Sequence, residues 1–144
     1  TRLMKHLLSW AGLALVLHLL WEIGQLPFYQ LPLDLRFRLY AVLHCTLGDV
    51  LIGTLTFCGT AALMRSWNWP VRAPWRGGLL MVTAGIVYTG FSEWYNVYRM
   101  ANWTYAPRMP LIAGMGLMPL LQWLLVPSLM LVIVHWRWAR QRPD

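Results

Sequence analysis

Charged side chains are scarce in this sequence. Asp, Glu, Lys and Arg make up 12% of the 144 residues, whereas a soluble domain carries about 25%. Hydrophobic residues make up 58%, which leaves too little polar surface to cover a globule in water. The scarcity of charge therefore excludes an ordinary soluble domain and favours an integral membrane protein.

Cysteine and acidic residues are scarce too. Cys45 and Cys58 are the only cysteines, and we interpret them as small apolar core residues because they form no CxxC or haem-attachment motif. Only five acids oppose twelve basic residues, for a net charge of +7. The basic residues sit at the ends of apolar runs, not in a patch, so we expect no nucleic-acid partner.

What the sequence has in quantity is long apolar runs. Each of four runs can supply the roughly 20 residues that cross a bilayer, at about 7–28, 39–64, 78–98 and 110–136. A backbone in lipid must satisfy its own hydrogen bonds, so these runs are helices. The sequence thus predicts an all-α integral membrane protein, a four-helix transmembrane bundle forming one domain over residues 1–144. Pro119 and Pro127 should kink the fourth helix.

The basic residues also predict an orientation. An even number of spans puts both termini on one side, and the basic residues divide eight to four in favour of that side: Arg2, Lys5, Arg65, Arg72, Arg76, Arg137, Arg140 and Arg142 against Arg36, Arg38, Arg99 and Arg108. Basic loops stay in the cytoplasm. We therefore expect cytoplasmic termini and a place in the bacterial inner membrane.

Three of the five acids, Glu22, Asp49 and Glu93, fall inside the predicted spans. A lone charge at the centre of a bilayer costs about 2.5–3.5 kcal/mol, so these acids should face the bundle interior and have partners. Counting along the helices places Glu22, His44 and Glu93 in one layer. His18 and Asp49 then form a second layer one turn deeper.

Other polar and aromatic residues share these faces. Asn96 follows Glu93 by three residues, Gln25 lies near the mouth, and the fourth helix contributes Gln122 and Trp123. Each alone has a structural explanation, because single polar groups often join membrane helices and Gly48, Gly53, Gly85 and Gly90 permit close helix contact. Neutral residues would join helices at lower cost, however, so the cluster as a whole favours a functional site.

Three chemistries suit such a cluster. Two imidazoles and three carboxylates can bind zinc or iron, in which case His18, Glu22, His44 and Glu93 would be the ligands. Ionisable chains can also relay protons, although the inner half of the bundle is apolar. The third chemistry is acid–base catalysis on a lipophilic substrate, in which one group donates a proton, another removes one, and aromatic faces such as Trp21, Trp94 and Trp123 stabilise the cation between the steps.

Two stretches carry a resemblance to a known family. His18-Leu-Leu-Trp-Glu22-Ile-Gly, ending in Pro27-Phe28-Tyr29, resembles the first helix of the emopamil-binding (EXPERA-type) four-helix domain, and Gln122-Trp123-Leu-Leu-Val-Pro127 resembles its last helix. The resemblance implies sterol isomerase chemistry, with His18 and Glu22 as acid–base pair and Trp123 as cation stabiliser. The family's Asn one turn before the Trp is Leu120 here. Trp21-Glu22 with its following aromatics is also similar to membrane-bound terpene cyclases.

The sequence thus predicts an intramembrane isomerase or cyclase that acts on an isoprenoid- or sterol-like substrate by protonation and deprotonation. The predicted catalytic residues are Glu22, His18, Glu93, His44 and Asp49, and the predicted substrate-binding residues are Trp21, Trp94, Asn96, Gln122 and Trp123. We expect no cofactor, although a metal stays open. The expected partners are the lipid bilayer and a hydrophobic small molecule, and a homodimer stays open. The alternatives are a non-catalytic metal- or lipid-binding protein and a structural subunit of a membrane complex.

Overall fold

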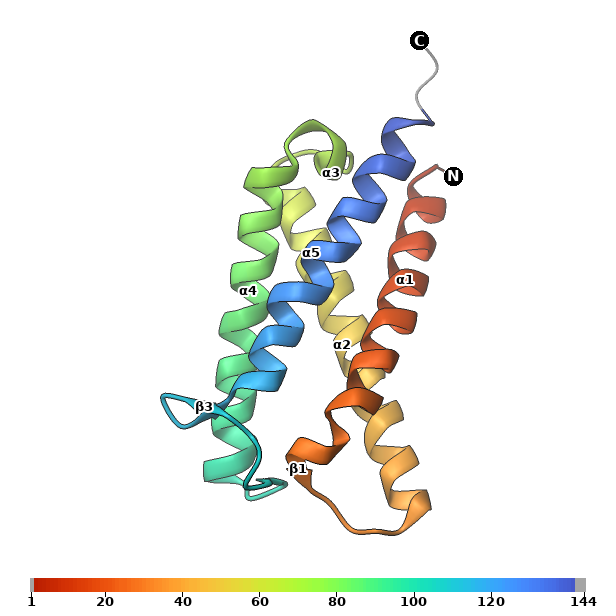
Figure 1. Ribbon diagram of the computed structural model, residues 1–144. Helices are drawn as coiled ribbons and strands as arrows, with labels where there is room; N and C mark the ends of the chain where they lie inside the picture. Colours follow the sequence, from red (N-terminus) through yellow and green to blue (C-terminus); the bar gives the residue numbers. More distant parts are fainter. Residues whose placement is uncertain (1, 142–144) are drawn as a thin grey trace.

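The computed structural model describes residues 2–141 and is mostly helical. Its long helices are α1 (Arg2–Gln25), α2 (Leu35–Leu63), α4 (Pro74–Trp94) and α5 (Leu117–Ala139). Each packs against two neighbours, so that α1, α2, α4 and α5 follow one another around a bundle (Figure 1). The start of α1 and the end of α5 lie at the same end of the bundle.

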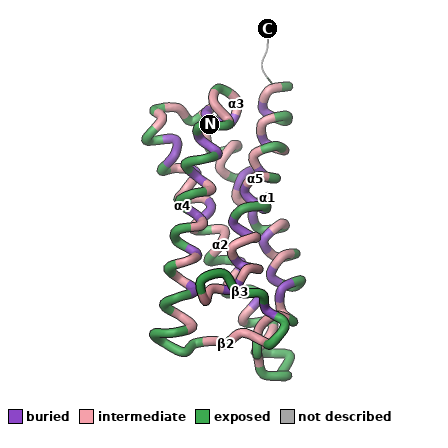
Figure 2. Tube along the Cα trace, turned by 60° about the vertical axis from the view of Figure 1, so that its left-hand side comes forward, coloured by how far each residue is buried: buried purple, intermediate pink, exposed green. Residues whose placement is uncertain are grey.

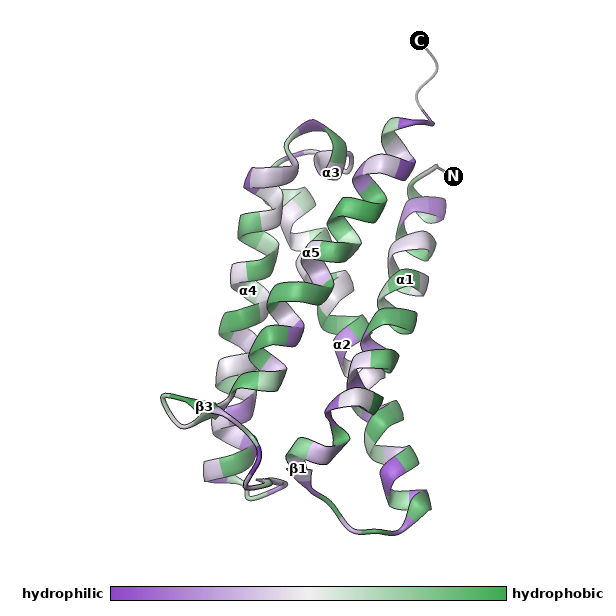
Figure 3. Ribbon diagram, viewed as in Figure 1, coloured by the Kyte–Doolittle hydropathy of each residue, from purple (hydrophilic) through white to green (hydrophobic). Residues whose placement is uncertain are grey.

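Three helical segments are long and apolar enough to cross a membrane: Leu3–Phe28, Leu35–Leu63 and Leu117–Ala139. Their outward side chains are mostly Leu, Val and Ile, which are exposed along the helices. Hydrophobic residues occupy the middle of the bundle and hydrophilic ones gather toward its ends (Figure 3). These features support a membrane protein.

Short elements close both ends of the bundle. A 3-10 turn, η1 (Leu26–Phe28), leads into β1 (Tyr29–Gln30), and a π-helical turn, η2 (Tyr95–Arg99), leads toward β2 (Thr104–Tyr105). β1 and β2 pair antiparallel, with Tyr29 opposite Tyr105. At the opposite end, α3 (Trp69–Arg72) sits between α2 and α4.

The aromatic core fills the half of the bundle that holds the start of α1 and the end of α5. Trp10, Phe57, Trp69, Met130 and Trp138 are each at most 4% exposed and form one cluster. The Trp10 indole donates to the Gly53 carbonyl at 3.2 Å and so ties α1 to α2. The buried residues lie on the inner sides of the helices (Figure 2). This half is close-packed, so the open space lies in the other half.

The last helix starts later than the sequence predicts. Residues 111–116 form a hairpin of β3 (Leu111–Ile112) and β4 (Met115–Gly116), with Ala113 and Gly114 at positive φ. The predicted span of 110–136 was therefore wrong at its beginning. The predicted kink at Pro119 was also wrong, because Pro119 falls in the first turn of α5, where a backbone donor has no helical partner. Pro127 does lie inside the helix.

The other predicted spans began too late. α1 starts at Arg2, α2 at Leu35 and α4 at Pro74, each four or five residues before the apolar run that predicted it. At the start of α2, the Asp34 side chain accepts a hydrogen bond from the Phe37 backbone at 2.9 Å. Such a cap extends a helix into polar sequence, which a count of apolar residues does not detect.

Candidate functional site

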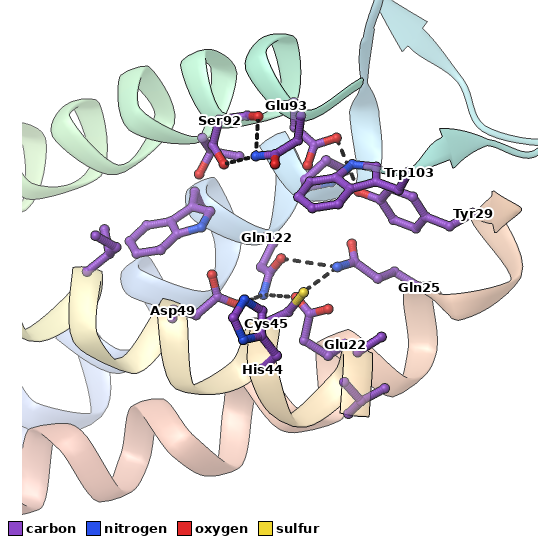
Figure 4. Close-up of a pocket in the computed structure, with 18 of the residues that line it drawn as sticks. Glu22, Gln25, Tyr29, His44, Cys45, Asp49, Ser92, Glu93, Trp103 and Gln122 are labelled. Carbon is purple, nitrogen blue, oxygen red and sulfur yellow. Dashed lines mark hydrogen bonds between the residues drawn. The ribbon is translucent and has the colours of Figure 1, made fainter. Parts of the chain in front are cut away.

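A polar cavity of about 310 Å³ lies in the half of the bundle away from the aromatic core. Its back wall comes from α1 and α5, its sides from α2 and α4, and its end from β1 and the segment before β2. The lining includes three acids, Glu22, Asp49 and Glu93, which Figure 4 shows with Gln25, Gln122 and Tyr29. The residues that line the cavity include Glu22, Gln25, Tyr29, His44, Gly48, Asp49, Tyr88, Glu93, Trp103, Gln122 and Trp123.

The side-chain amide of Gln122 stands at the centre of the back wall. Its Nε2 lies 2.8 Å from Asp49 Oδ2 and 3.0 Å from Glu22 Oε1. The same nitrogen lies 2.9 Å from His18 Nδ1. One atom of α5 thus joins two side chains of α1 to one of α2, and Gln122 itself is only 2% exposed.

Gln25 completes this network at its outer edge. Its Nε2 donates to Glu22 Oε1 at 2.8 Å and faces Gln122 Oε1 at 3.5 Å. The Trp21 indole donates to Gln25 Oε1 at 3.2 Å. Helical spacing explains the arrangement, because residues 18, 21, 22 and 25 of α1 lie on one side of the helix.

His18 stands behind the cavity surface. Its side chain is fully buried, its Nδ1 lies 3.5 Å from Asp49 Oδ2, and its ring lies 5.3 Å from the ring of Trp123. It is not one of the residues that line the cavity. His18 can therefore help to position Asp49, but a molecule in the cavity would not touch it.

Glu93 forms a separate centre on the α4 side. Its Oε2 accepts from Tyr105 at 2.6 Å and from Tyr29 at 3.4 Å. The two tyrosines face one another across the β1–β2 pair, with ring centroids 5.7 Å apart. Burial and the neighbouring Glu93 raise the pKa of Tyr29 and of Tyr105 above the ordinary value, so both phenols keep their protons and act as donors.

Trp123 forms the inner floor of the cavity. It is 2% exposed and sits against Gly85 of α4, where an added Cβ would lie 2.3 Å from the indole. Gly53 of α2 lies 4.0 Å from the same ring by the same measure. The prediction that glycines permit close packing is confirmed at Gly85, whereas Gly48 faces open space.

Several predicted site residues lie elsewhere. His44 was predicted to share a layer with Glu22 and Glu93, but it is exposed at the cavity edge and stacks on Tyr40, 5.5 Å away. Trp94 is 50% exposed beside Phe91, outside the cavity. Trp21 lines an apolar groove between α1 and α5 instead and reaches the site only through Gln25.

Asn96 lines the cavity, and its hydrogen-bond partners in the described part of the chain are Ser92 and Asn102, not Glu93. Its Nδ2 donates to the Ser92 carbonyl at 2.8 Å, and its Oδ1 accepts from Asn102 at 2.7 Å. These bonds anchor the π-helical turn that ends α4. Such turns occur often at functional sites, and this one directs the chain toward Trp103 and Tyr105.

The predicted metal ligands do not assemble. Within residues 2–141, no three His, Cys, Asp or Glu side chains are grouped so that they could hold a metal ion. The set of His18, Glu22, His44 and Glu93 fails because His44 turns outward and Glu93 is bonded to tyrosines on the other wall. Instead, the carboxyl groups of Glu22 and Asp49 and the imidazole of His18 all lie close to the amide nitrogen of Gln122.

Sequence reasoning missed the two tyrosines that hold Glu93. Both lie beyond the helices, where helical spacing gives no depth or face. The available signal was their position, since Tyr29 follows the end of the first apolar run and Tyr105 follows the third. Compared with known protein families, curated proteins and solved structures, the chain matches none.

Proposed function

We propose that this chain is a four-helix transmembrane enzyme, an isomerase or cyclase that protonates and deprotonates a hydrophobic isoprenoid- or sterol-like molecule. The observation that carries the proposal is the sharing of Gln122 Nε2 by Glu22 and Asp49 inside a cavity of ligand size. Placing two acids together inside the bundle is costly. Hydrogen bonds that only hold helices together would not need either acid.

The proposed reaction uses the two carboxylate centres in turn. Glu22, on the cavity surface, donates a proton to an alkene carbon: its O–H bond breaks and the π electrons form a new C–H bond. Glu93, on the other wall, removes a proton from a carbon next to the cation, and that C–H pair becomes the new double bond. In a cyclase, a second double bond attacks the cation before this loss. One proton enters and one leaves, so no oxidant or reductant is needed.

The cavity lining can stabilise a carbocation and limit its capture by water. Trp123, Trp103 and Tyr88 line the cavity with aromatic faces, which attract cations. The tyrosines at Glu93 and the strand pair beyond them close the end of the cavity. Once Glu22 has given up its proton, its carboxylate, together with Asp49 and Glu93, can supply negative charge around the cation.

The test is proton exchange with solvent. Purified protein in lipid nanodiscs is incubated in D₂O with a panel of sterols and polyprenyl compounds, and the products are analysed by mass spectrometry and NMR. We expect one substrate to gain deuterium at carbon and to show a shifted double bond or a new ring. A panel without any enzyme-dependent deuterium would contradict the proposal.

A further inference from the structure

The exposed residues of the cavity lining lie on α2 and α4. Three lining residues are exposed there: His44 and Gly48 on α2, and Tyr88 on α4, which is 46% exposed. The lining residues of the back wall, in contrast, are closed off, since Glu22, Gln25, Gln122 and Trp123 are 2–7% exposed. A molecule can therefore reach the carboxylates from the side of the bundle.

This opening lies at the depth of the hydrocarbon. Gly48 is thirteen residues after Leu35, the first residue of α2, and thus about 20 Å along the helix at about 1.5 Å per residue. α2 is one of the helices able to cross a membrane. If α2 spans the bilayer, the opening faces lipid tails, so whatever enters must first dissolve in them.

The charge of the lining excludes one large group of isoprenoids. The 21 lining residues include Glu22, Asp49 and Glu93 but no Lys or Arg. Proteins hold phosphate groups with Lys, Arg, helix N-termini or metal ions. A diphosphate in this cavity would meet three carboxyl groups and no Lys or Arg, and within residues 2–141 no three His, Cys, Asp or Glu side chains are grouped to hold a bridging metal ion. It would also have to leave water to pass through lipid.

Resting on the proposed function, we infer that the substrate is an isoprenoid without a diphosphate group, which enters from the bilayer between α2 and α4 past Gly48. The reaction then begins by protonation and not by departure of a diphosphate. An earlier reaction must therefore supply the hydrocarbon with its phosphate groups already removed or replaced.

Gly48 provides a direct test of the path. A Cβ at Gly48 would meet nothing within 4 Å, and the same holds for Gly59, another exposed glycine of α2 that lies outside the cavity. Gly48→Leu should therefore fold and obstruct the opening, and Gly59→Leu is its matched control. Thermal melting of both variants checks that they fold.

The probes are farnesol and farnesyl diphosphate, which share one chain and differ in the end group. Radiolabelled farnesol is titrated into nanodiscs that contain the full chain, empty discs are subtracted, and farnesyl diphosphate is added as competitor. We expect saturable binding of farnesol, at least about tenfold weaker in Gly48→Leu and unchanged in Gly59→Leu, and competition by the diphosphate at least about tenfold weaker than by unlabelled farnesol.

The outcomes separate the inference from the function on which it rests. Equal competition by the diphosphate, or equal binding by Gly48→Leu and Gly59→Leu, would overturn the inference and leave acid–base chemistry on isoprenoids standing. No saturable binding of either probe to the unmodified chain would overturn both.

Discussion

At the scale of single residues, the amide of Gln122 organises the site. It has two N–H hydrogens but lies within 3.0 Å of three acceptor atoms, on His18, Glu22 and Asp49. Two hydrogens cannot serve three acceptors with good geometry at once. One of the three groups can therefore carry a proton itself, which is compatible with the proposed role of Glu22 as proton donor.

Glu22→Gln separates catalysis from structure. The amide keeps an oxygen that can accept from Gln25 and Gln122 but loses the transferable proton. We expect a folded protein with a nearly unchanged melting temperature and activity lower by at least about 10²-fold, since general acid catalysis contributes about 10²–10⁴-fold. The assays are deuterium incorporation and thermal melting.

The companion variant is Glu22→Leu, which should lower the melting temperature because it removes the buried oxygen that accepts from both Gln25 and Gln122. An active Glu22→Gln protein would end the role of Glu22 as acid and leave Glu93 as the candidate.

Tyr105→Phe tests the second centre. It removes the 2.6 Å hydrogen bond to Glu93 and leaves the 3.4 Å bond from Tyr29. We expect a loss of stability of about 1.5–3 kcal/mol, as for a hydrogen bond to a charged group, and slower turnover with farnesol binding retained. Tyr40→Phe, at a ring 63% exposed, is the control and should change neither. Equal behaviour of the two variants would remove Tyr105 from the site.

How far the sequence predicts the site depends on where a residue lies. Spacing on one helix correctly grouped His18 with Glu22. The cost of a charge in lipid correctly indicated that Glu22 and Glu93 are buried, while Asp49 is partly buried beside Gln122. Counting residues gives depth but not the rotation of one helix against the next, so His44 was placed inside when it turns to the edge. Tyr29 and Tyr105 were missed because strand pairing between distant segments leaves no periodic signal in a two-residue strand.

At the scale of elements, an apolar segment is not always part of a helix. The segment 110–116 is apolar enough to extend the last span, yet Gly114 at φ +80° and the positive φ of Ala113 turn it into a hairpin. Gly permits this conformation because it has no Cβ. The later start of α5 leaves Gln122 less than two turns from the beginning of the helix, where it contacts Glu22 and Asp49.

Gly85→Ala tests the packing of α4 on α5. The added methyl would lie 2.3 Å from the indole of Trp123, so the ring or the helix must move, which typically costs about 1–3 kcal/mol. We expect a lower melting temperature. Gly59→Ala meets nothing within 4 Å and should be neutral or stabilising, because Ala favours helix by about 1 kcal/mol over Gly. Equal melting of the two variants would contradict the close contact at Gly85.

At the scale of the whole molecule, the number of transmembrane spans determines whether the two termini lie on the same side of the membrane. Three helices are apolar enough to span by composition, and α4, which carries Arg76 in its first turn, is not among them. Yet α4 packs between α2 and α5 along the bundle, and α1 begins at the end where α5 stops (Figure 1). A polar first turn at the membrane surface reconciles these facts, because Arg can extend its charge to the headgroups.

Reporter fusions test this topology. With α4 as a fourth span, both chain ends lie on one side, and the eight basic residues against four place that side in the cytoplasm. A phosphatase active only outside the cytoplasm should then be inactive when fused before Thr1 or after Asp144, and active when inserted at Leu33, in the connection between α1 and α2. If α4 did not cross, the two ends would lie on opposite sides and one terminal fusion would become active. Activity at both ends, with none at Leu33, would instead keep four spans and reverse the charge-based orientation, so the three fusions together distinguish the span count from its direction.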